Sequence, residues 1–473
     1  MQIQTEGTFP QLPEEQEENF SLSEAGIAVD VGTSTVAVNI WSLGTKKCLA
    51  TVAEQNVQIR YGYDVIKRIS FATRTKSSAT QQLESPLSIL HYSIIEQLEK
   101  LFTKVISLAQ NKLPRGVRIH VSRIVITGNT TMMSFVCGAD VSGLQAAPFS
   151  PSSLFGFTTT WEDVRRATID SSWPKLDCPE AQVLQIFSSS LIDCSTPVYF
   201  PPCVGAFIGS DAVCSMLSAG FPSTKEDSSV WQAPVDCPLL LADIGTNSEI
   251  ALYIPKANGK PAKILCTSAA AGPAFEGSNI SCGMSSTSGA IESLTYKGEL
   301  ISKTIDDTTA RGICGSGLIS AVSTLLKHKF IDKAGVIQRG NSKLADGSNC
   351  IPLTPAVYLT QQDIRNVQLA KSAVYIGLSY MIEHSPSLPV FCIAGGFGTH
   401  INIEEACNIK LIPNELKNRC VHLGNASLAG ASALLFSKKL RQKASEIAKS
   451  AFQINLAGVP DFQSRYLHAI DFN

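Results

Sequence analysis

Residues 26–40 read GIAVDVGTSTVAVNI, and residues 238–254 read PLLLADIGTNSEIALYI. Each stretch places an Asp-x-Gly-Thr corner between two runs of apolar and β-branched residues, which is the pattern of a β-hairpin. When Asp30 is aligned with Asp243, the glycines and threonines that follow them also align, so the corner is an internal repeat. The repeat predicts a pseudo-symmetric α/β protein with two lobes, each opening with the same hairpin.

The two corners carry the kinds of groups that bind a triphosphate and a divalent cation. Gly32 and Gly245 let the backbone approach phosphate oxygens without a Cβ clash, and consecutive N–H groups at such a corner form an anion-binding nest. Asp30 and Asp243 are the expected catalytic carboxylates and would hold Mg²⁺ mostly through water, because magnesium dehydrates reluctantly. The other donors of the corners are Thr33, Ser34, Thr35, Thr246 and Asn247.

A single corner of this kind is more typical of an ordinary hairpin with a surface aspartate than of a nucleotide site. Two copies in matching strand context reverse that preference. The P-loop pattern G-x-x-x-x-G-K-[ST] does not occur in the sequence, so the expected site belongs to another class. We therefore predict that ATP and Mg²⁺ bind in a cleft between the two lobes.

A glycine-rich loop after the apolar run VFCIA is a candidate for contact with adenine. Glycines at the end of a strand let a flat ring lie against the backbone, although a plain strand-to-helix turn has the same pattern. The residues of this loop are Gly395, Gly396, Phe397 and Gly398.

A second loop, residues 269–277, reads AAAGPAFEG. Gly272 and Pro273 would make it rigid, and Glu276 is a candidate acceptor for a ribose hydroxyl, with a purely structural turn as the slightly favoured alternative. Asp211, in the run FIGSDA, is a candidate to orient the attacking water or Mg²⁺. The alternative for Asp211, a helix N-cap, is equally compatible with the pattern.

Asp363, Arg365 and Lys371 recur at helical spacing. We expect them to form a solvated helix face with ion pairs, because residues three and four apart meet on a helix surface. A contact between Lys371 and the nucleotide is the alternative.

Length and charge limit the classes of protein that fit. The chain has 473 residues, of which 44% are hydrophobic, and this is too long for one compact core. Its 39 basic and 40 acidic residues give a net charge of -1, so bulk electrostatics favour neither nucleic acid nor anionic membrane. No apolar run reaches the roughly 20 residues of a membrane span, and the polar, acidic N-terminus lacks a signal-peptide pattern. We expect a cytoplasmic protein without nucleic-acid or membrane partners.

The composition along the chain suggests where the lobes begin and end. Residues 1–24 are acidic and have little to bury, which predicts a disordered tail. Residues 25–200 are expected to form the first ATPase lobe, with the Ser-, Thr- and Pro-rich residues 148–200 as a variable connection. Residues 201–473 would form the second lobe. Apolar residues at helical spacing predict a helix over residues 86–108.

The 14 cysteines are dispersed, without a C-x-x-C pair, a ferredoxin run or a zinc knuckle. Scattered cysteines of this kind are usually small buried hydrophobic residues. The 7 histidines form no H-x-x-x-H pair, so no zinc site is predicted. No Ser/His/Asp or Cys/His set for hydrolysis stands out either.

Further blocks follow the hairpins in a fixed order and carry a family resemblance. They are ITGNTTMMSFVCG (126–138), PPCVGAFIGSDA (201–212), TSAAAGPAFEGSNISCGMSSTSGAIE (267–292), RGICGSGLIS (311–320) and LGNASLAGA (423–431). Together with the corners and the adenosine loop, they resemble the superfamily of acetate and sugar kinases, heat-shock chaperones and actin. The resemblance is stronger to one branch, the ATP-dependent reductive activators of corrinoid proteins, and it covers nearly everything after residue 25.

The resemblance implies an α/β, two-lobed actin-like (ribonuclease H-like) ATPase fold with duplicated phosphate-binding hairpins and an interlobe nucleotide cleft. It also implies an enzyme that uses ATP to return an inactive Co(II) corrinoid protein of a methyltransferase system to Co(I). The partner would be that corrinoid protein, and a homodimer is compatible with the resemblance.

The sequence departs from the family at two places. Typical members begin with a 2Fe–2S ferredoxin-like domain, whereas the first cysteine here is Cys48, inside the expected ATPase. We therefore predict no intrinsic iron–sulfur cluster and a separate low-potential electron donor, either a ferredoxin or a flavoprotein. Members also often carry His after the GNTTM block, where this chain has Met133 and Ser134.

Three other functions stay open at the level of sequence. A small-molecule kinase of the same fold would need a catalytic carboxylate facing a polyol, and no sugar-kinase signature separates the corners. An activator of a 2-hydroxyacyl-CoA dehydratase-like enzyme would hold a 4Fe–4S cluster between subunits, for which Cys203, Cys282 and Cys314 are candidates. An ATP-binding assembly protein would need a self-complementary surface.

Overall fold

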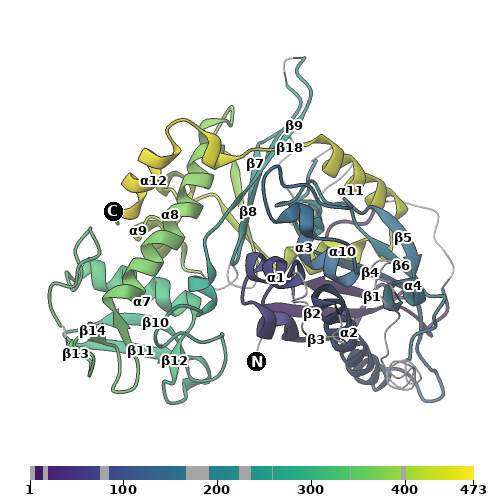
Figure 1. Cartoon of the computed structure of the whole chain (residues 1–473), viewed down its shortest axis with the longest axis horizontal. Helices are drawn as coiled ribbons and strands as arrows, with labels where there is room; N and C mark the ends of the chain where they lie inside the picture. Colours follow the sequence, from purple (N-terminus) through teal and green to yellow (C-terminus); the bar gives the residue numbers. More distant parts are fainter. Residues whose placement is uncertain are drawn as a thin grey trace. The chain divides into compact units, whose positions relative to one another are not determined.

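The computed structural model shows two compact units. The N unit comprises Thr5–Ala233 and Asn425–Ala451, and the C unit comprises Pro234–Gly424 and Phe452–Asn473 (Figure 1). The residues that the structure describes are 6–13, 20–74, 85–166, 191–222, 236–257, 259–340, 342–395 and 401–472.

The N unit is built on a six-stranded mixed sheet in the order β3-β2-β1-β4-β6-β5. Its strands are β1 (Glu24–Val31), β2 (Thr35–Ser42), β3 (Cys48–Gln55), β4 (His120–Gly128), β5 (Phe157–Thr160) and β6 (Pro197–Phe200). Strands β1, β2 and β3 form an antiparallel meander, while β4 runs parallel to β1 and β6 runs parallel to β4. Strand β1 is central and almost wholly buried, as expected for a strand covered on both faces.

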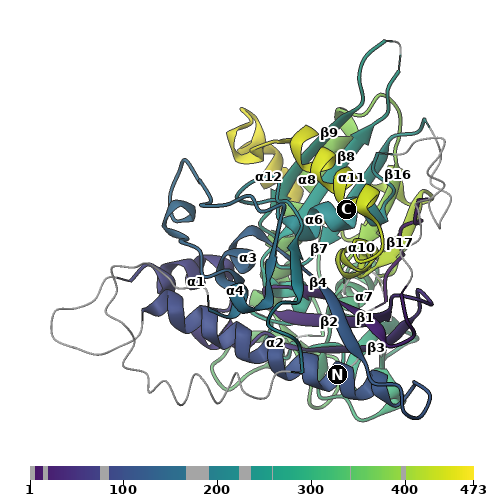
Figure 2. The same ribbon diagram turned by 90° about the vertical axis from the view of Figure 1, so that its right-hand side faces the viewer.

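Helices cover both faces of this sheet. Helix α2 packs against β2, β3 and α3, and helix α10 packs against β1, β4 and α6 on the opposite face (Figure 2). Gly430 lets α10 and α6 approach closely, since a Cβ there would lie 2.1 Å from the carbonyl oxygen of Cys214. The helices are α1 (Val65–Ala72), α2 (Pro86–Gln110), α3 (Thr130–Val136), α4 (Trp161–Arg165), α6 (Ser210–Ser218), α10 (Ala426–Ala433) and α11 (Lys438–Ser450).

Five consecutive strands of the C-unit sheet repeat an order found in the N unit, and the sixth strand lies at the other edge. Its six-stranded sheet runs β17-β16-β7-β8-β9-β18, and β7 pairs antiparallel with β8 and parallel with β16, as β1 does with β2 and β4. The sequence prediction of two lobes that open with the same hairpin is therefore confirmed. The strands are β7 (Leu239–Ile244), β8 (Ser248–Ile254), β9 (Lys263–Ala269), β16 (Val390–Ala394), β17 (Cys420–Gly424) and β18 (Ala451–Gln453).

Within the described residues, two small sheets and four α-helices complete the C unit. Helix α8 buries an apolar face that includes Ile364, Val367 and Val374 in the core formed with β8, β9 and α7. The helices are α7 (Gly315–Lys327), α8 (Gln361–Glu383), α9 (Ile403–Asn408) and α12 (Phe462–Ile470). The small sheets contain β10 (Ala290–Tyr296), β11 (Leu300–Thr304) and β12 (Gly312–Ile313), and β13 (Ser342–Lys343), β14 (Asn349–Pro352) and β15 (Tyr358–Thr360).

Part of the expected disordered tail is ordered. The Phe9 ring lies 5.0 Å from that of Trp41 and 6.2 Å from that of Phe436. The Asn425 N–H also donates to the Glu6 carbonyl, at 2.9 Å. The structure differs from the prediction because Phe9 supplies an apolar anchor within an otherwise polar segment. The acidic run, residues 14–19, lies outside the described residues.

The predicted variable connection, residues 148–200, contains core elements. Strands β5 and β6 belong to the N-unit sheet, and the Trp161 side chain on α4 is fully buried. The Trp161 indole N–H donates to Glu99 Oε1 at 3.0 Å, so α4 is fixed to α2. The N unit also continues past residue 200, and it takes in α6, α10 and α11. Residues 167–190 of the predicted connection lie outside the described part.

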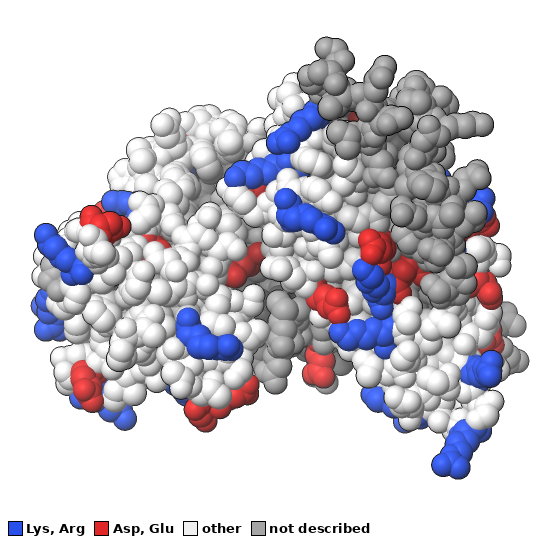
Figure 3. All heavy atoms as spheres, turned by 60° about the horizontal axis from the view of Figure 1, so that its bottom comes forward, with Lys and Arg blue, Asp and Glu red and all other residues white. Residues whose placement is uncertain are grey.

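Charged side chains of both signs are interspersed on the face drawn in Figure 3. This mixture agrees with the net charge of -1. Among the described residues, no helix combines the length and the apolar character needed to cross a membrane.

Candidate functional site

The first Asp-x-Gly-Thr corner lies at the end of β1, in the N unit. Asp30 pairs in register with Ala37 on β2 and with Thr127 on β4, so its partly buried carboxylate lies where β1 and β4 both end. The Gly32 N–H donates to the Thr35 carbonyl at 2.9 Å and closes the corner. A Cβ on Gly32 would lie 2.8 Å from that carbonyl oxygen, so the tight corner requires glycine.

The loop that follows β4 is attached to this corner. Asn129 Nδ2 donates to Thr33 Oγ1 at 3.1 Å, and Asn129 Oδ1 accepts from the Met132 N–H as the N-cap of α3. Ser34 contributes its carbonyl, which accepts from the Asn56 N–H at 2.9 Å. The corner is therefore held by side chains and backbone groups from β4 and from the start of η1 (Val57–Tyr61).

Arg68 and Asn56, which sequence reasoning did not single out, also hold the first corner. The Arg68 side chain on α1 is fully buried, and its NH2 group donates to the Thr33 carbonyl at 2.6 Å while Nε donates to the Gly62 carbonyl at 2.8 Å. Asn56 Nδ2 donates to the Gly32 carbonyl at 2.8 Å. Burial lowers the Arg68 pKa to about 10, so the guanidinium is charged at neutral pH.

Helix α6 adds Asp211 to the same end of the N-unit sheet. Ser210 Oγ lies 2.8 Å from Thr127 Oγ1, and a Cβ on Gly209 would lie 2.4 Å from the Asn129 Cα, so α6 begins directly beside β4. The N-cap of α6 is Gly209, and Asp211 belongs to the first turn. The N-cap alternative for Asp211 is therefore wrong.

Asp30 and Asp211 act electrostatically on one thiol. Burial raises the pKa of Cys214 on α6, and the two carboxylates raise it further. Burial likewise raises the pKa of Cys203 to about 12. These thiols are therefore protonated at neutral pH and have little nucleophilic or ligand character.

The second corner has the same strand pairing in the C unit. Asp243 lies one residue before the end of β7, where it pairs with Glu249 on β8 and with Ala394 on β16. Gly395 has a positive φ of 93°, and a Cβ there would lie 2.7 Å from Asp243 Oδ1. Gly395 thus lets the chain pass directly beside the carboxylate.

The remaining adenine-loop residues, Gly396, Phe397 and Gly398, lie outside the described residues. Contact of this loop with adenine stays a prediction.

The loop after β9 covers the second corner. Glu276 Oε1 accepts from the Thr246 N–H at 2.7 Å and from Thr246 Oγ1 at 2.8 Å. The Gly272 N–H donates to the Thr246 carbonyl at 2.8 Å. Glu276 therefore contacts a corner residue, and its predicted bond to a ribose hydroxyl is untested. Gly245 and Asn247, on either side of Thr246, are half-buried.

The predicted solvated face of α8 is wrong for Asp363 and Lys371, whereas Arg365 is exposed as predicted. Asp363 and Lys371 are both buried. Asp363 forms the capping box of α8 with Thr360, and the Lys371 ammonium donates to the carbonyls of Ala469 and Asp471. Lys371 therefore binds the C-terminal segment of the C unit, which leaves its alternative contact with a nucleotide without support.

Among the described residues, no group of three or more His, Cys, Asp or Glu side chains is arranged to hold a metal ion. Each corner carries one partly buried aspartate.

The fold and the duplicated corners define an actin-like, or ASKHA, ATPase domain. Residues 238–473 match the family model described as the C-terminal ASKHA domain of RACo, and residues 25–168 match the model of the RACo middle region. The chain belongs to this RACo family. The predicted fold class and the family resemblance are both confirmed.

A solved structure and two curated relatives agree with this assignment. The structure of a reductive activator for corrinoid, iron–sulfur protein matches with a TM-score of 0.77 and 26% identity, over 96% of this chain and 67% of that one. The corrinoid activation enzyme RamQ of Eubacterium limosum is 28% identical over 93% of this chain and 69% of its own length. A Co(II) methylated amine-specific corrinoid protein reductase of Methanosarcina barkeri is 26% identical over 94% and 77%.

Proposed function

We propose that this protein uses ATP to restore a corrinoid protein from Co(II) to Co(I) within a methyltransferase system. The observation that carries the proposal is the family match over both units, together with two Asp-x-Gly-Thr corners that have the same strand pairing. Both curated relatives are named for activation or reduction of corrinoid proteins. The proposal places the reaction in the cytoplasm, where ATP and low-potential electron carriers are available.

The two corners would bind the triphosphate. Backbone N–H groups beside Gly32 and Gly245 can donate to phosphate oxygens, because neither residue has a Cβ to prevent a close approach. Thr33, Ser34 and Thr35, with Thr246 and Asn247, would add hydroxyl and amide donors. Asp30 and Asp243 would hold Mg²⁺ through water, and the cation would neutralise charge on the phosphates.

Hydrolysis would require a positioned water. Asp211 is partly buried in the first turn of α6, beside the end of β4, and its carboxylate can accept a hydrogen bond from water. In phosphoryl transfer a protein mainly positions the reacting groups and neutralises charge. One carboxylate that positions the water would therefore be sufficient.

The free energy of ATP binding and hydrolysis would serve an uphill electron transfer. Each ~59 mV of unfavourable potential costs a factor of ten in the equilibrium, or about 1.4 kcal/mol for one electron. ATP can offset this cost only if it binds two conformations of the activator with different affinities, and if the corrinoid protein distinguishes the same two conformations.

The electron would come from a separate ferredoxin or flavoprotein. The cysteines of this chain lack ferredoxin spacing. Association into a homodimer stays a prediction.

A spectroscopic assay tests the proposal. The purified protein is mixed with ATP, Mg²⁺, a Co(II) corrinoid protein and a low-potential reductant, and the visible spectrum is followed for Co(I). The proposal requires Co(I) formation that depends on ATP and is lost when the protein is omitted. Phosphorylation of a small molecule without Co(I) formation would instead support a kinase, and ATP-dependent pelleting with neither activity would support an assembly protein.

A further inference from the structure

The carboxylate of Glu276 lies at the second corner. The backbone N–H and the hydroxyl of Thr246 are the donors that the sequence assigns to phosphate, and both donate to the same oxygen of Glu276, at 2.7 and 2.8 Å. An ideal Cβ on Gly245 would lie 3.4 Å from that oxygen, so the carboxylate also lies against the glycine of the corner. A carboxylate therefore fills the place that an anion-binding corner offers to a phosphate.

The backbone holds Glu276 in this position. Glu276 ends the short helix η3 (Pro273–Glu276), which is bounded by Gly272 at φ 76° and Gly277 at φ 82°. The Gly272 N–H donates to the Thr246 carbonyl, and Gly277 is packed so closely that a Cβ would lie 2.6 Å from the Met284 carbonyl oxygen. Both ends of the loop are thus anchored, and the carboxylate is directed at the corner by its backbone.

We propose that Glu276 occupies the phosphate position of the second corner before nucleotide binds, and that a phosphate group of ATP displaces it. This inference rests on the proposed ATPase function. A buried N–H must have an acceptor, and the Glu276 carboxylate supplies one to Thr246. Two anions within about 3 Å of the same donors repel each other, so the carboxylate and a phosphate cannot share them.

The displacement would be transmitted beyond the corner. The N–H and the hydroxyl of Ser281, a few residues after Glu276, both donate to Asp363 Oδ1 at the start of α8. The Met284 N–H donates to the Ile313 carbonyl, directly before α7. The loop that Glu276 fixes to the corner is therefore attached to the first turn of α8 and to the residues that precede α7.

A comparison of ligands with and without phosphate tests the proposal. Calorimetry measures the affinities of three ligands for the wild type and for Glu276→Gln. The ligands are adenosine without Mg²⁺, MgADP and MgATP. The amide keeps the shape of the side chain but removes the charge, and hydrogen bonds to a neutral acceptor are weaker. We expect Glu276→Gln to bind MgATP roughly five- to tenfold more tightly, with adenosine affinity unchanged.

Glu405→Gln is the matched control. Glu405 lies in the same unit, on α9, and accepts one hydrogen bond from the Ser320 hydroxyl at 2.9 Å. It should change none of the three affinities. If Glu276→Gln weakens MgATP binding or leaves it unchanged, displacement is wrong, and weaker binding would assign Glu276 to orienting Thr246 for the nucleotide. If the wild type binds no MgATP, the proposed function fails instead.

Hydrogen exchange tests the same proposal without a substitution. The N–H groups of Gly277 and Ser278 donate to the carbonyls of Ala274 and Pro273, respectively, within the loop. If ATP displaces Glu276, exchange at these two amides should accelerate several-fold in MgATP and should not change in adenosine. Unchanged exchange in saturating MgATP would overturn the proposal, even if the Gln variant did not fold.

Discussion

Asp243 is placed at the end of a buried strand, yet its carboxylate is partly accessible and lies directly beside Gly395. An ionised group is retained at the edge of a core only where water, a cation or hydrogen bonds can stabilise it. The corresponding position of the N unit is held by Asp30, with the same strand pairing on both sides. The two residues are therefore the direct test of the proposed Mg²⁺-nucleotide site.

Asp243→Ala should reduce ATP turnover by at least about 100-fold, because removal of one preorganised electrostatic group at a reacting phosphate typically costs that much. Phosphate release at saturating MgATP measures the effect. Asp346→Ala removes an exposed aspartate of the same unit and should leave turnover unchanged. Normal turnover in Asp243→Ala would remove this residue from the site.

Arg68→Met should destabilise the N unit by about 2–4 kcal/mol, because the carbonyls of Thr33 and Gly62 lose a charged donor in a buried place. Urea unfolding measures the loss, and MgATP affinity should fall with it, since Arg68 supports the first corner. Arg115→Met, an exposed position of the same unit, is the control. An unchanged free energy of unfolding would show that the Arg68 contacts are not important for the corner.

At the scale of elements, sequence patterns predicted the hairpins and the helix that depend on the local spacing of apolar residues. The hairpins β1–β2 and β7–β8 follow from alternating apolar runs around a glycine corner, and α2 follows from its apolar spacing over residues 86–108. The helix extends two residues further, to Gln110, and Pro114 and Gly116 follow four and six residues later.

The contacts between distant segments were not predictable in the same way. The bond between Thr246 and Glu276 joins residues on separate loops, and Asn56 and Arg68 reach the first corner from separate turns. A single sequence has no periodicity that reports such pairs. Helix α10 and strand β1 are likewise in contact although several hundred residues separate them in the sequence, and only the fold reveals this contact.

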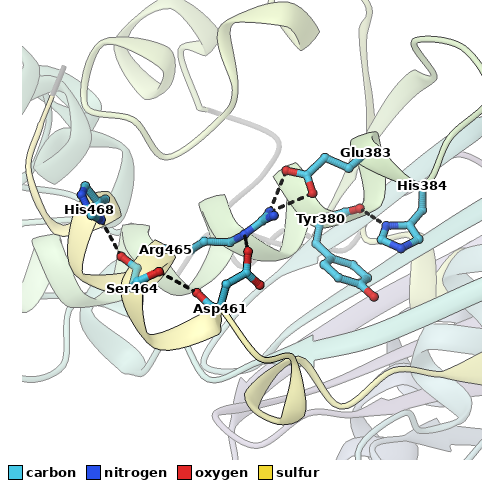
Figure 4. Close-up of polar contacts among 7 residues, drawn as sticks. All are labelled: Tyr380, Glu383, His384, Asp461, Ser464, Arg465 and His468. Atoms are coloured by element: carbon cyan, nitrogen blue, oxygen red, sulfur yellow. Dashed lines mark hydrogen bonds and ion pairs between the residues drawn. The ribbon is translucent and has the colours of Figure 1, made fainter.

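Arg465 and Lys371 join α12 to α8, the first in an exposed cluster and the second in a buried position. Arg465 on α12 contacts both carboxylate oxygens of Glu383 on α8, at 2.7 and 2.8 Å, and Asp461 Oδ2 at 2.6 Å (Figure 4). This cluster is exposed, and exposed pairs contribute little to stability. Lys371 lies in the buried part of the same junction and binds the carbonyls of Ala469 and Asp471.

Lys371 should make the stability of the C unit depend on pH. Burial, and then Lys410, lower its pKa to about 7, against roughly 10.4 for an unfolded lysine. Between these values the unfolded chain binds more protons than the folded one, so stability should rise as pH increases from about 7 to about 10. Thermal unfolding of the wild type and Lys371→Met across this range measures the difference.

The stability of Lys371→Met should not show this rise with pH. The stability of Lys327→Met, which replaces an exposed lysine of α7, should still show it. Identical pH profiles for the wild type and Lys371→Met would show that the ammonium titrates normally in the folded protein.

At the scale of the whole molecule, the proposal demands a coupling between two ligands. Each unit carries one corner and one aspartate, and the proposed function requires a nucleotide that would bind to both. ATP can assist the reduction of a bound partner only if it changes the free energy of a conformation to which that partner is sensitive. The coupling free energy between two binding sites is reciprocal.

This reciprocity gives a quantitative prediction. If MgATP changes the affinity for the Co(II) corrinoid protein by a given factor, the corrinoid protein should change the affinity for MgATP by the same factor, which for typical couplings is about 5- to 150-fold. Calorimetric titration of each ligand in the presence and absence of the other measures both factors, with a nonhydrolysable analogue replacing ATP so that the system stays at equilibrium.

Asp243→Ala should bring both factors close to one, because a nucleotide that is not fixed at the second corner cannot favour one conformation. Factors of one in the wild type, combined with ATP-dependent Co(I) formation, would show that ATP acts through a step after the partner has bound. Hydrolysis itself, rather than nucleotide binding, would then have to supply the free energy for the electron transfer.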